Sequence, residues 1–128
     1  IIGRGNTIGG MVGYSVYTTF SEVFTNIVLA GGSTVGGFIG STYASQIEKT
    51  YTLSDIQNAT GQVGGLIGST ASYQTTTLDQ TYTATHPLPT NANVYGVINE
   101  GNNDVIGEDN YWNFETGATV ISGTTEAE

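Results

Sequence analysis

The stretch Val63-Gly64-Gly65-Leu66-Ile67-Gly68 decides the fold, because it recurs with small changes along most of the chain. Two earlier copies occupy residues 8–13 and 35–40, and a decayed copy occupies residues 94–99. The middle glycines of successive copies are Gly10, Gly37, Gly65 and Gly96, so the spacing is 27, then 28, then 31 (37−10, 65−37 and 96−65). A period in this range indicates stacked supersecondary units. The chain is therefore predicted to be a repeat protein.

The glycines of each copy have different expected roles. The last glycine is replaced by Asn99 in the fourth copy, and asparagine is the residue that best replaces glycine in the left-handed backbone region. We therefore expect the equivalent Gly13, Gly40 and Gly68 to turn the chain. The first glycine of the pair becomes Tyr95, which predicts a position that tolerates a side chain. The middle glycine is kept in all four copies, which indicates a close approach of a neighbouring group.

A second similarity lies between the boxes, at residues 20–25, 47–52 and 78–83. Each unit of about 28 residues has too few apolar side chains to offset its ordering entropy, at about 1–2 kcal/mol per residue. The deficit closes if successive units pair edge to edge, about 4.8 Å apart, around a shared core. We therefore predict an all-β fold, a parallel β-helix or β-solenoid of about three to four coils.

The solenoid is expected over residues 1–99, with a closing segment at 100–128. Turns are expected at 30–33 and 58–61, and the extra residues of the longest repeat are expected to bulge as a loop within 69–77. The segment His86-Pro87-Leu88-Pro89 predicts a loop or an exposed edge, because proline cannot donate a ladder hydrogen bond.

Composition narrows the class of protein. The chain has 128 residues, fits one domain, and carries a net charge of −9 with only two strong cations, Arg4 and Lys49. Nucleic acid and anionic membrane surfaces are therefore excluded as partners. There is no cysteine, and no apolar run reaches the ~20 residues of a membrane span. Such an acidic surface suits an extracellular protein, and the start at Ile1-Ile2 leads us to expect a processed protein or a piece of a longer one.

The two ends of the predicted stack differ. Tyr111, Trp112 and Phe114 form a dense aromatic group that is expected to plug the last coil. No comparable group precedes Ile8, so we expect the first coil to be continued by preceding sequence or by another molecule.

The glycine boxes, followed by Thr-Tyr-Thr strands, resemble the GLUG motif repeats of bacterial and archaeal surface proteins. The segment Asn110-Tyr111-Trp112-Asn113-Phe114-Glu115-Thr116, followed by Thr124-Thr125-Glu126, is similar to the segment that commonly closes such arrays. The resemblance covers residues 8–126, with departures at Tyr95, Asn99 and Asn113 and at the proline-containing insertion. It implies a secreted, adhesin-like β-solenoid, also seen as a non-catalytic region of immunoglobulin A-specific metallopeptidases, and it implies no defined reaction.

Candidate catalytic groups are few. The glycine boxes lack the Gly-Lys-Ser/Thr of a phosphate loop, and His86 has no His-Glu-x-x-His context, so we interpret it as a solvent-exposed loop histidine. Glu48 and Asp79 occupy equivalent positions of adjacent units, with Asp55 nearby, which leaves a carbohydrate-cleaving pair conceivable. Surface acids that repeat with the coil are the preferred interpretation. We therefore predict no enzyme, and no catalytic, cofactor or metal residues.

Calcium is kept as an alternative at one place. Acidic and amide side chains with glycine turns suit Ca²⁺, although their spacing fits no known loop. A solvated acidic turn is preferred. The residues concerned are Glu100, Asp104, Glu108 and Asp109, interleaved with Asn99, Asn102, Asn103 and Asn110.

Threonines could form outward ladders of the kind that bind ice or crystalline polysaccharide. The candidates are Thr50 and Thr52, Thr81 and Thr83, with Val23 and Thr25 one coil earlier. Strict alternation from inward Phe20, Ile47 and Leu78 would also turn Glu22, Lys49 and Gln80 inward, so a bend or bulge is expected between them. Asn58-Ala59-Thr60 is a glycosylation sequon in an expected turn.

The sequence therefore favours a non-enzymatic extracellular stalk or adhesion domain, with a host or matrix protein or a glycan as partner. Two alternatives stay open. One is a self-assembling subunit whose end at residues 1–13 adds to another copy, giving a filament. The other is a carbohydrate-binding or carbohydrate-cleaving β-helix. The sequence does not name the ligand.

Overall fold

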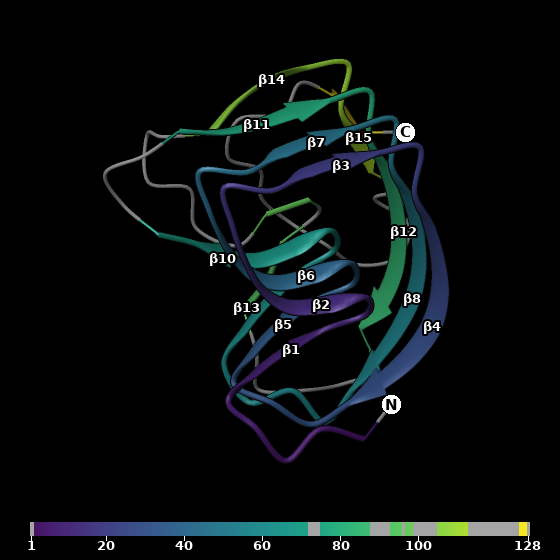
Figure 1. The fold of residues 1–128 in the computed structure, drawn as a ribbon. Coiled ribbons are helices and arrows are strands. Elements are labelled where there is room, and N and C mark those ends of the chain that lie inside the picture. Colours follow the sequence, from purple (N-terminus) through teal and green to yellow (C-terminus); the bar gives the residue numbers. More distant parts are fainter. Residues whose placement is uncertain are drawn as a thin grey trace.

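In the computed structural model the chain forms an all-β parallel solenoid (Figure 1). The structure describes residues 2–71, 75–87, 93–95, 97–98, 105–112 and 126–127. Every strand pair among these residues is parallel, and each coil contributes one strand to each of four sheets. The predicted fold class is therefore confirmed.

The strands belong to four sheets, which we number in the order in which a coil visits them. Sheet 1 contains β1 (Thr7–Gly9), β5 (Thr34–Gly36), β9 (Gln62–Gly64) and β13 (Asn93–Tyr95). Sheet 2 contains β2 (Val12–Val16), β6 (Ile39–Tyr43) and β10 (Ile67–Thr70). Sheet 3 contains β3 (Thr19–Ser21), β7 (Gln46–Glu48), β11 (Thr76–Asp79) and β14 (Val105–Glu108). Sheet 4 contains β4 (Phe24–Ala30), β8 (Tyr51–Gln57), β12 (Tyr82–Pro87), β15 (Tyr111–Trp112) and β16 (Glu126–Ala127).

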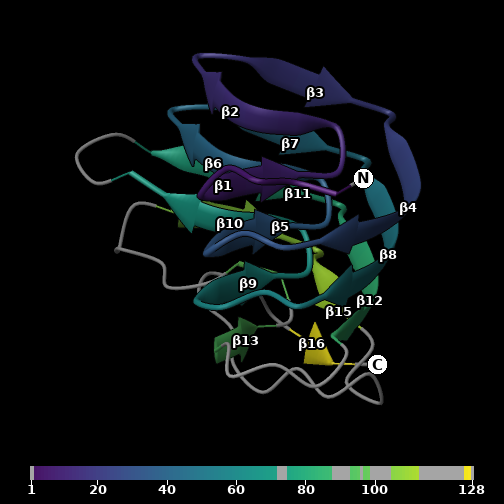
Figure 2. The ribbon, with the colours of Figure 1, turned by 90° about the horizontal axis from the view of Figure 1, so that it is seen from below.

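Three coils, β1–β4, β5–β8 and β9–β12, stack in register, and Figure 2 shows their strands lying rung upon rung. The glycine boxes align, with Gly36 paired to Gly64. Strands β14, β15 and β16 extend sheets 3 and 4 beyond the third coil, so the described part of residues 100–128 adds further rungs. The predicted plug side chains of Trp112 and Phe114 lie outside the described residues.

The extra residues of the third repeat fall where they were predicted. Thr42 pairs with Thr70, a step of 28 in the numbering (70−42), whereas Gln46 pairs with Thr77, a step of 31 (77−46). Three residues are therefore inserted between β10 and β11, and the strands on both sides keep their register.

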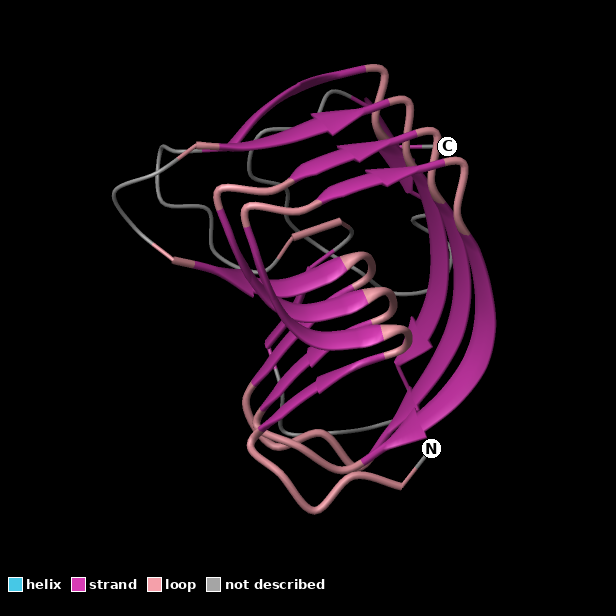
Figure 3. Cartoon of the chain, in the orientation of Figure 1, coloured by secondary structure: helices cyan, strands magenta, loops and turns pink. Residues whose placement is uncertain are grey.

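The glycine box folds each coil back on itself as an arch between sheets 1 and 2, and the arch tips point toward sheet 4 (Figure 3). The two legs of the arch approach backbone to backbone. A Cβ at Gly40 would lie 2.7 Å from the Gly13 carbonyl oxygen and 2.8 Å from the Ile8 carbonyl, and one at Gly68 would lie 2.5 Å from the Gly40 oxygen. No side chain fits between the legs.

The structure corrects two predictions about the glycines of the box. Gly13, Gly40 and Gly68 do not adopt the left-handed backbone; among described glycines only Gly31 and Gly32 have positive φ. The first glycine of the pair does not tolerate a side chain in the second coil, because a Cβ at Gly36 would collide with the Ile39 carbonyl oxygen. Asn99 and the Tyr95 side chain lie outside the described residues.

The middle glycine is kept for the predicted reason. A Cβ at Gly37 would collide with the Gly65 carbonyl of the next coil and lie 2.8 Å from Ser54 Oγ and 3.0 Å from Thr52 Oγ1. The arch tip therefore touches both the coil beside it and the inner face of sheet 4. As a result, the arch divides the interior into two cores.

One core lies between sheets 2 and 3, and the other between sheets 1 and 4. The first contains the large apolar residues of the boxes, with Ile47 and Leu78 from sheet 3. The second contains Leu29 and Ile56 from sheet 4 with the leading valines of the boxes. The buried members are Phe38, Ile39, Ile47, Leu66, Ile67, Leu78, Val97 and Ile98 in the first core, and Ile8, Leu29, Val35, Ile56, Ala59 and Val63 in the second.

The predicted outward threonine ladders are wrong, because these threonines are buried. Thr25 Oγ1 donates to Thr52 Oγ1 at 2.7 Å, and Thr52 and Ser54 share a hydrogen bond of 2.9 Å. Thr25 and Ser54 also donate to the Gly37 carbonyl at the arch tip. A row of satisfied hydroxyls thus separates the two apolar cores. The other threonines of the predicted ladders, Thr50, Thr81 and Thr83, are also buried, and Val23 packs against the first core.

The predicted bend explains why the threonines point inward. Glu22, Lys49 and Gln80 all have positive φ, of 57°, 48° and 52°. They form the corner between sheets 3 and 4. The corner resets the alternation, so that Ile47 before it and Thr50 after it are both buried.

We predict that Gly40→Ala lowers the free energy of unfolding by about 1–3 kcal/mol, because the added methyl group has no space between the legs of the arch. Gly13→Ala is the matched control from the coil before, where a Cβ meets only the Thr7 carbonyl oxygen at 3.9 Å, and its effect should stay within about 0.5 kcal/mol. Urea unfolding measures both. Equal losses in the two variants would contradict the arch contact.

Candidate functional site

The outward faces of the coils carry the chemically active side chains, and the first candidate is a column of acids on sheet 3. Glu48 pairs with Asp79, and Asp79 pairs with Glu108, so three carboxylates follow one another at a spacing of about 4.8 Å along the stack. All three are exposed. Ser21 Oγ donates to Glu48 Oε1 at 2.6 Å and extends the column by one coil.

The predicted pair Glu48 and Asp79 is thus brought onto adjacent rungs, but Asp55 lies on sheet 4, on a different face of the coil. Both side chains of the pair are exposed on the outer face of sheet 3. A retaining glycosidase holds its two carboxyls ~5–5.5 Å apart within a cleft, where burial separates their acidities. The column places one carboxylate on each of three adjacent rungs, but these carboxylates are exposed.

The predicted calcium group is only partly described. Glu108 and Asp109 are exposed. Asn110, by contrast, is fully buried: its Oδ1 accepts from Thr81 N at 3.1 Å and Thr81 Oγ1 at 2.7 Å, and its Nδ2 donates to the Leu78 carbonyl at 3.0 Å. Asn110 therefore ties one coil to the next instead of facing a cation. Within the described ranges, no group of three His, Asp or Glu residues could hold a metal ion. The remaining members, Asn99, Glu100, Asn102, Asn103 and Asp104, lie outside the described residues.

A ladder of aromatic rings runs along the outer face of sheet 4. The Phe24 and Tyr51 ring centroids are 5.2 Å apart with an interplanar angle of 16°, and those of Tyr51 and Tyr82 are 5.1 Å apart with an angle of 24°. Because the rings stack face to face, their faces cover one another. The ladder therefore holds the coils together. Tyr51, between two rings, presents mainly its edge to solvent, whereas Phe24 at the end of the ladder is 55% exposed.

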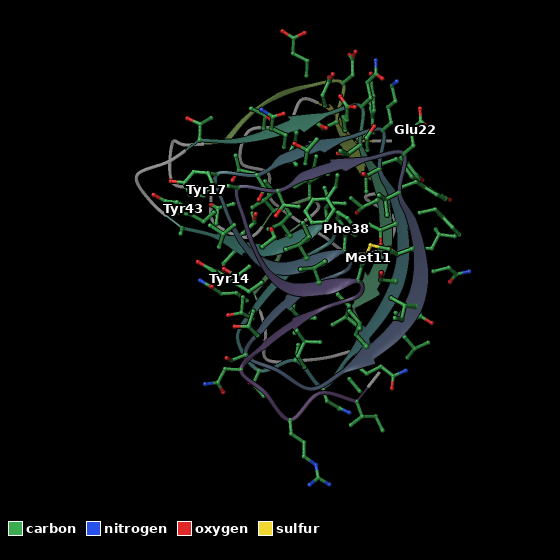
Figure 4. All side chains as sticks on the ribbon, viewed as in Figure 1. Met11, Tyr14, Tyr17, Glu22, Phe38 and Tyr43 are labelled. Carbon is green, nitrogen blue, oxygen red and sulfur yellow. The ribbon has the colours of Figure 1, made fainter. Side chains whose placement is uncertain are left out.

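A second aromatic group lies around the corner between sheets 2 and 3, where Figure 4 labels Tyr14, Tyr17 and Tyr43. Tyr14 is 60% exposed and Tyr17 is 68% exposed. The rings of Tyr17 and Tyr43 meet edge to face at 5.4 Å. The hydrogen bond with Tyr17, followed by burial and the neighbouring phenols, raises the pKa of Tyr43 above its ordinary value. We call Tyr14, Tyr17 and Tyr43 the tyrosine patch.

Neither aromatic feature was predicted from the sequence. A periodic signal for the ladder exists, because Phe24, Tyr51, Tyr82 and Tyr111 share one register column. The tyrosine patch leaves no such signal. Tyr43 pairs with Val16, and Tyr17 sits at a corner with a positive φ of 49°, so its members come from different columns.

The histidine prediction needs correction. His86 lies in strand β12, in register with Asp55, and Pro87 is the last residue of the same strand, so this part of the segment is not a loop. Among the described pairs, β15 pairs with β12 only at Tyr82 and Thr83. At Pro87, β12 therefore pairs with β8 alone, so the N–H that proline lacks is not needed for a bond to β15. Asn58 of the sequon is exposed in a turn with a positive φ of 54°, as predicted for that turn.

Comparisons with protein-family models, curated proteins and solved structures gave no match to this chain. In the part of the chain that the structure describes, no helix is long and apolar enough to cross a membrane.

We predict that Asp79→Asn raises the free energy of unfolding by about 0.2–1 kcal/mol at low salt, because like charges directly opposite on neighbouring strands repel. Added salt should shrink the gain, since screening already weakens the repulsion in the wild type. Glu22→Gln is the matched control. It removes a carboxylate whose Oε1 lies 3.8 Å from Lys49 Nζ, and it should give no gain. A loss in Asp79→Asn would show that the acid column is not repulsive.

The raised pKa of Tyr43 predicts a pH dependence. The folded state holds the phenol proton more tightly, so the contribution of the Tyr17–Tyr43 hydrogen bond is complete below about pH 10 and is lost as the pH rises through the folded-state pKa. Unfolding curves of the wild type and Tyr43→Phe should therefore converge in alkaline solution. Tyr17→Phe keeps the ring contact but removes the hydrogen-bond partner, and it should converge in the same way. A Tyr17→Phe variant with wild-type pH dependence would contradict this cause.

Proposed function

We propose that this chain is a non-enzymatic structural module displayed outside the cell, a stalk or adhesion domain of a larger surface protein, and that its partner is a matrix or host protein or a glycan. The observation that carries the proposal is that inward-facing and outward-facing side chains have different roles. Inward residues form two apolar cores and a hydrogen-bonded threonine row, all of which join one coil to the next. The outer faces, which repeat with each rung, are the surfaces that can bind a partner.

Composition and resemblance support the same proposal. The net charge of −9, with two cations, makes an acidic surface that favours solubility and disfavours polyanions as partners. The likeness of the boxes and of the tail to GLUG motif repeats implies a secreted surface protein of adhesin type.

The tyrosine patch is the best candidate for the contact surface. Tyrosine combines a large apolar ring with a hydroxyl group, and it is enriched where proteins bind other proteins. The rings of Tyr14 and Tyr17 are mostly exposed, whereas Tyr51, between two rings of the sheet 4 ladder, is 37% exposed. They project beside hydroxyl-bearing strands, where Ser69 Oγ donates to Ser41 Oγ at 2.9 Å.

The enzyme alternative rests on the exposed pair Glu48 and Asp79. Carboxylates on the solvent-facing side of a sheet stay solvated. A carboxylic acid that serves as a general acid near neutral pH is typically held in a partly buried, apolar site. The pair is better explained as repeat-equivalent surface acids, of which Glu108 is a third member.

We expect the immobilised chain to retain at least one ligand from a panel of matrix proteins and glycans without releasing cleaved product. Replacing Tyr14 and Tyr17 together by serine should weaken that retention by about tenfold or more, since interface tyrosines are typical hot spots. Tyr51→Ser, in the stacked ladder, is the matched control and should retain the ligand like the wild type.

Two results would contradict the proposal. One is failure to retain any ligand of the panel, which would remove the adhesive role. The other is release of a cleaved glycan that stops in Glu48→Ala or Asp79→Ala, which would make the chain an enzyme.

A further inference from the structure

Asn58-Ala59-Thr60 is the one Asn-x-Ser/Thr sequence of the chain, and the structure places it where a modifying enzyme can reach it. Asn58 and Thr60 are exposed, whereas Ala59 between them is 2% exposed. The amide and the hydroxyl of the sequon therefore both lie on the solvent side of the turn from β8 to β9. Among the described residues, no hydrogen bond engages the Asn58 side chain.

The turn that holds Asn58 is one residue longer than its equivalent in the coil before. Residues 58–61 join β8 to β9, whereas residues 31–33 join β4 to β5, and the strands on both sides stay in register. The added residue bulges, as an extra residue on one strand of a pair does. The bulge directs Ala59 into the second core, so the residues before and after it face outward.

The neighbouring turn leaves space beside the sequon. Gly31 and Gly32 of that turn carry no side chain, and the backbone N and the Oγ1 of Thr60 both donate to the Gly32 carbonyl, at 3.0 Å and 3.3 Å. The backbone of Thr60 is thus held against the first coil. Asn58 has a φ of 54°, a conformation that asparagine adopts more readily than most residues. The turn therefore presents the Asn58 amide away from the coil.

We propose that Asn58 is the acceptor of an N-linked sugar. The Asn58 Nδ2 attacks the anomeric carbon of a sugar donor that carries a diphosphate leaving group. A C–N bond forms while the C–O bond to the diphosphate breaks, the diphosphate leaves with the electron pair, and a base of the modifying enzyme takes one amide proton. The Thr60 hydroxyl is the second group that this enzyme recognises. The donor is either a nucleotide sugar or a lipid-linked sugar, because both supply the same leaving group.

A sugar on Asn58 leaves the tyrosine patch open. The turn that carries Asn58 lies between sheets 4 and 1, whereas the patch lies around the corner between sheets 2 and 3. Figure 1 shows the two places at different ends of the coil, with the end of β8 near the bottom and the corner after β6 at the upper left. The modification goes beyond the proposed adhesive role and does not depend on it.

Mass spectrometry of the chain isolated from its natural source tests the site directly. The peptide that contains Asn58 should carry a sugar, and enzymatic hydrolysis of the bond between sugar and amide should convert Asn58 to an aspartate. The folded, unmodified chain then distinguishes the two donors. One sample receives UDP-glucose with a soluble N-glycosyltransferase, and the other receives a lipid-diphosphate-linked oligosaccharide with an oligosaccharyltransferase. The sample that reproduces the natural linkage identifies the donor.

Variants of the sequon separate the two groups. Asn58→Gln should abolish the modification. Thr60→Ala should lower its rate by roughly a hundredfold or more, because an enzyme site built to hydrogen-bond a hydroxyl rejects an acceptor that lacks it. Thr60→Ser keeps the hydroxyl and should remain a substrate. Circular dichroism of each variant checks that the strands remain folded.

The matched control places a second sequon in a strand. Val28→Thr creates one at Asn26, which is exposed like Asn58 but lies within β4, where the backbone pairs with β8 on both sides of it. The folded variant should therefore be modified at Asn58 and not at Asn26, since a paired, extended backbone cannot bend into the enzyme as a turn does.

Three outcomes would overturn the proposal. An unmodified Asn58 in the chain from its natural source would mean that the sequon is not used. Modification that persists in Asn58→Gln would mean that another residue accepts the sugar. Equal modification of Asn26 and Asn58 in the folded Val28→Thr variant would mean that exposure alone, and not the turn, selects the acceptor.

Discussion

The close approach of backbone to backbone at the glycine arch is the constraint on which the rest of the structure depends. The arch tip of one coil hydrogen-bonds to that of the next, with Gly37 N donating to the Gly64 carbonyl at 3.2 Å and Phe38 N to the Leu66 carbonyl at 3.0 Å. The same glycines leave no room for a Cβ between the legs of the arch. Direction reversal and coil stacking are therefore achieved by one set of residues.

The arch also explains the unusual interior. A solenoid coil normally encloses one core, but here the arch reaches sheet 4 and separates two. At the point of contact the carbonyl of Gly37 faces the inner side of sheet 4, where Thr25 and Ser54 donate to it. Burying an unpaired carbonyl would cost free energy, so hydroxyl side chains at these positions satisfy it and hydrogen-bond to one another along the stack. The buried threonines of sheet 4 thus serve the interior, and the outer faces carry the aromatic and acidic columns.

The repeat pattern predicted the parallel stack, the insertion between β10 and β11 and the bend at Glu22, Lys49 and Gln80, because each leaves a trace in spacing or in the order of apolar residues. It misplaced the threonines of sheet 4, which face inward. The reason lies at the corners. Lys49 adopts a left-handed backbone conformation although nothing in its chemistry marks it for that role, and this single conformation decides which face every following residue joins. The tyrosine patch was missed for a related reason, since its members come from different register columns.

The sequence by itself determined that neighbouring segments lie rung upon rung, because a nearly constant period survives in the chain as a countable distance between like residues. It also determined that the middle glycine is irreplaceable, since no copy has lost it. Only the tertiary structure decided why the outer glycines of the box are needed and which way the threonines point. Each of these depends on contacts between residues of different sheets, and such contacts are set by the path of the backbone through space, which spacing along the chain does not encode.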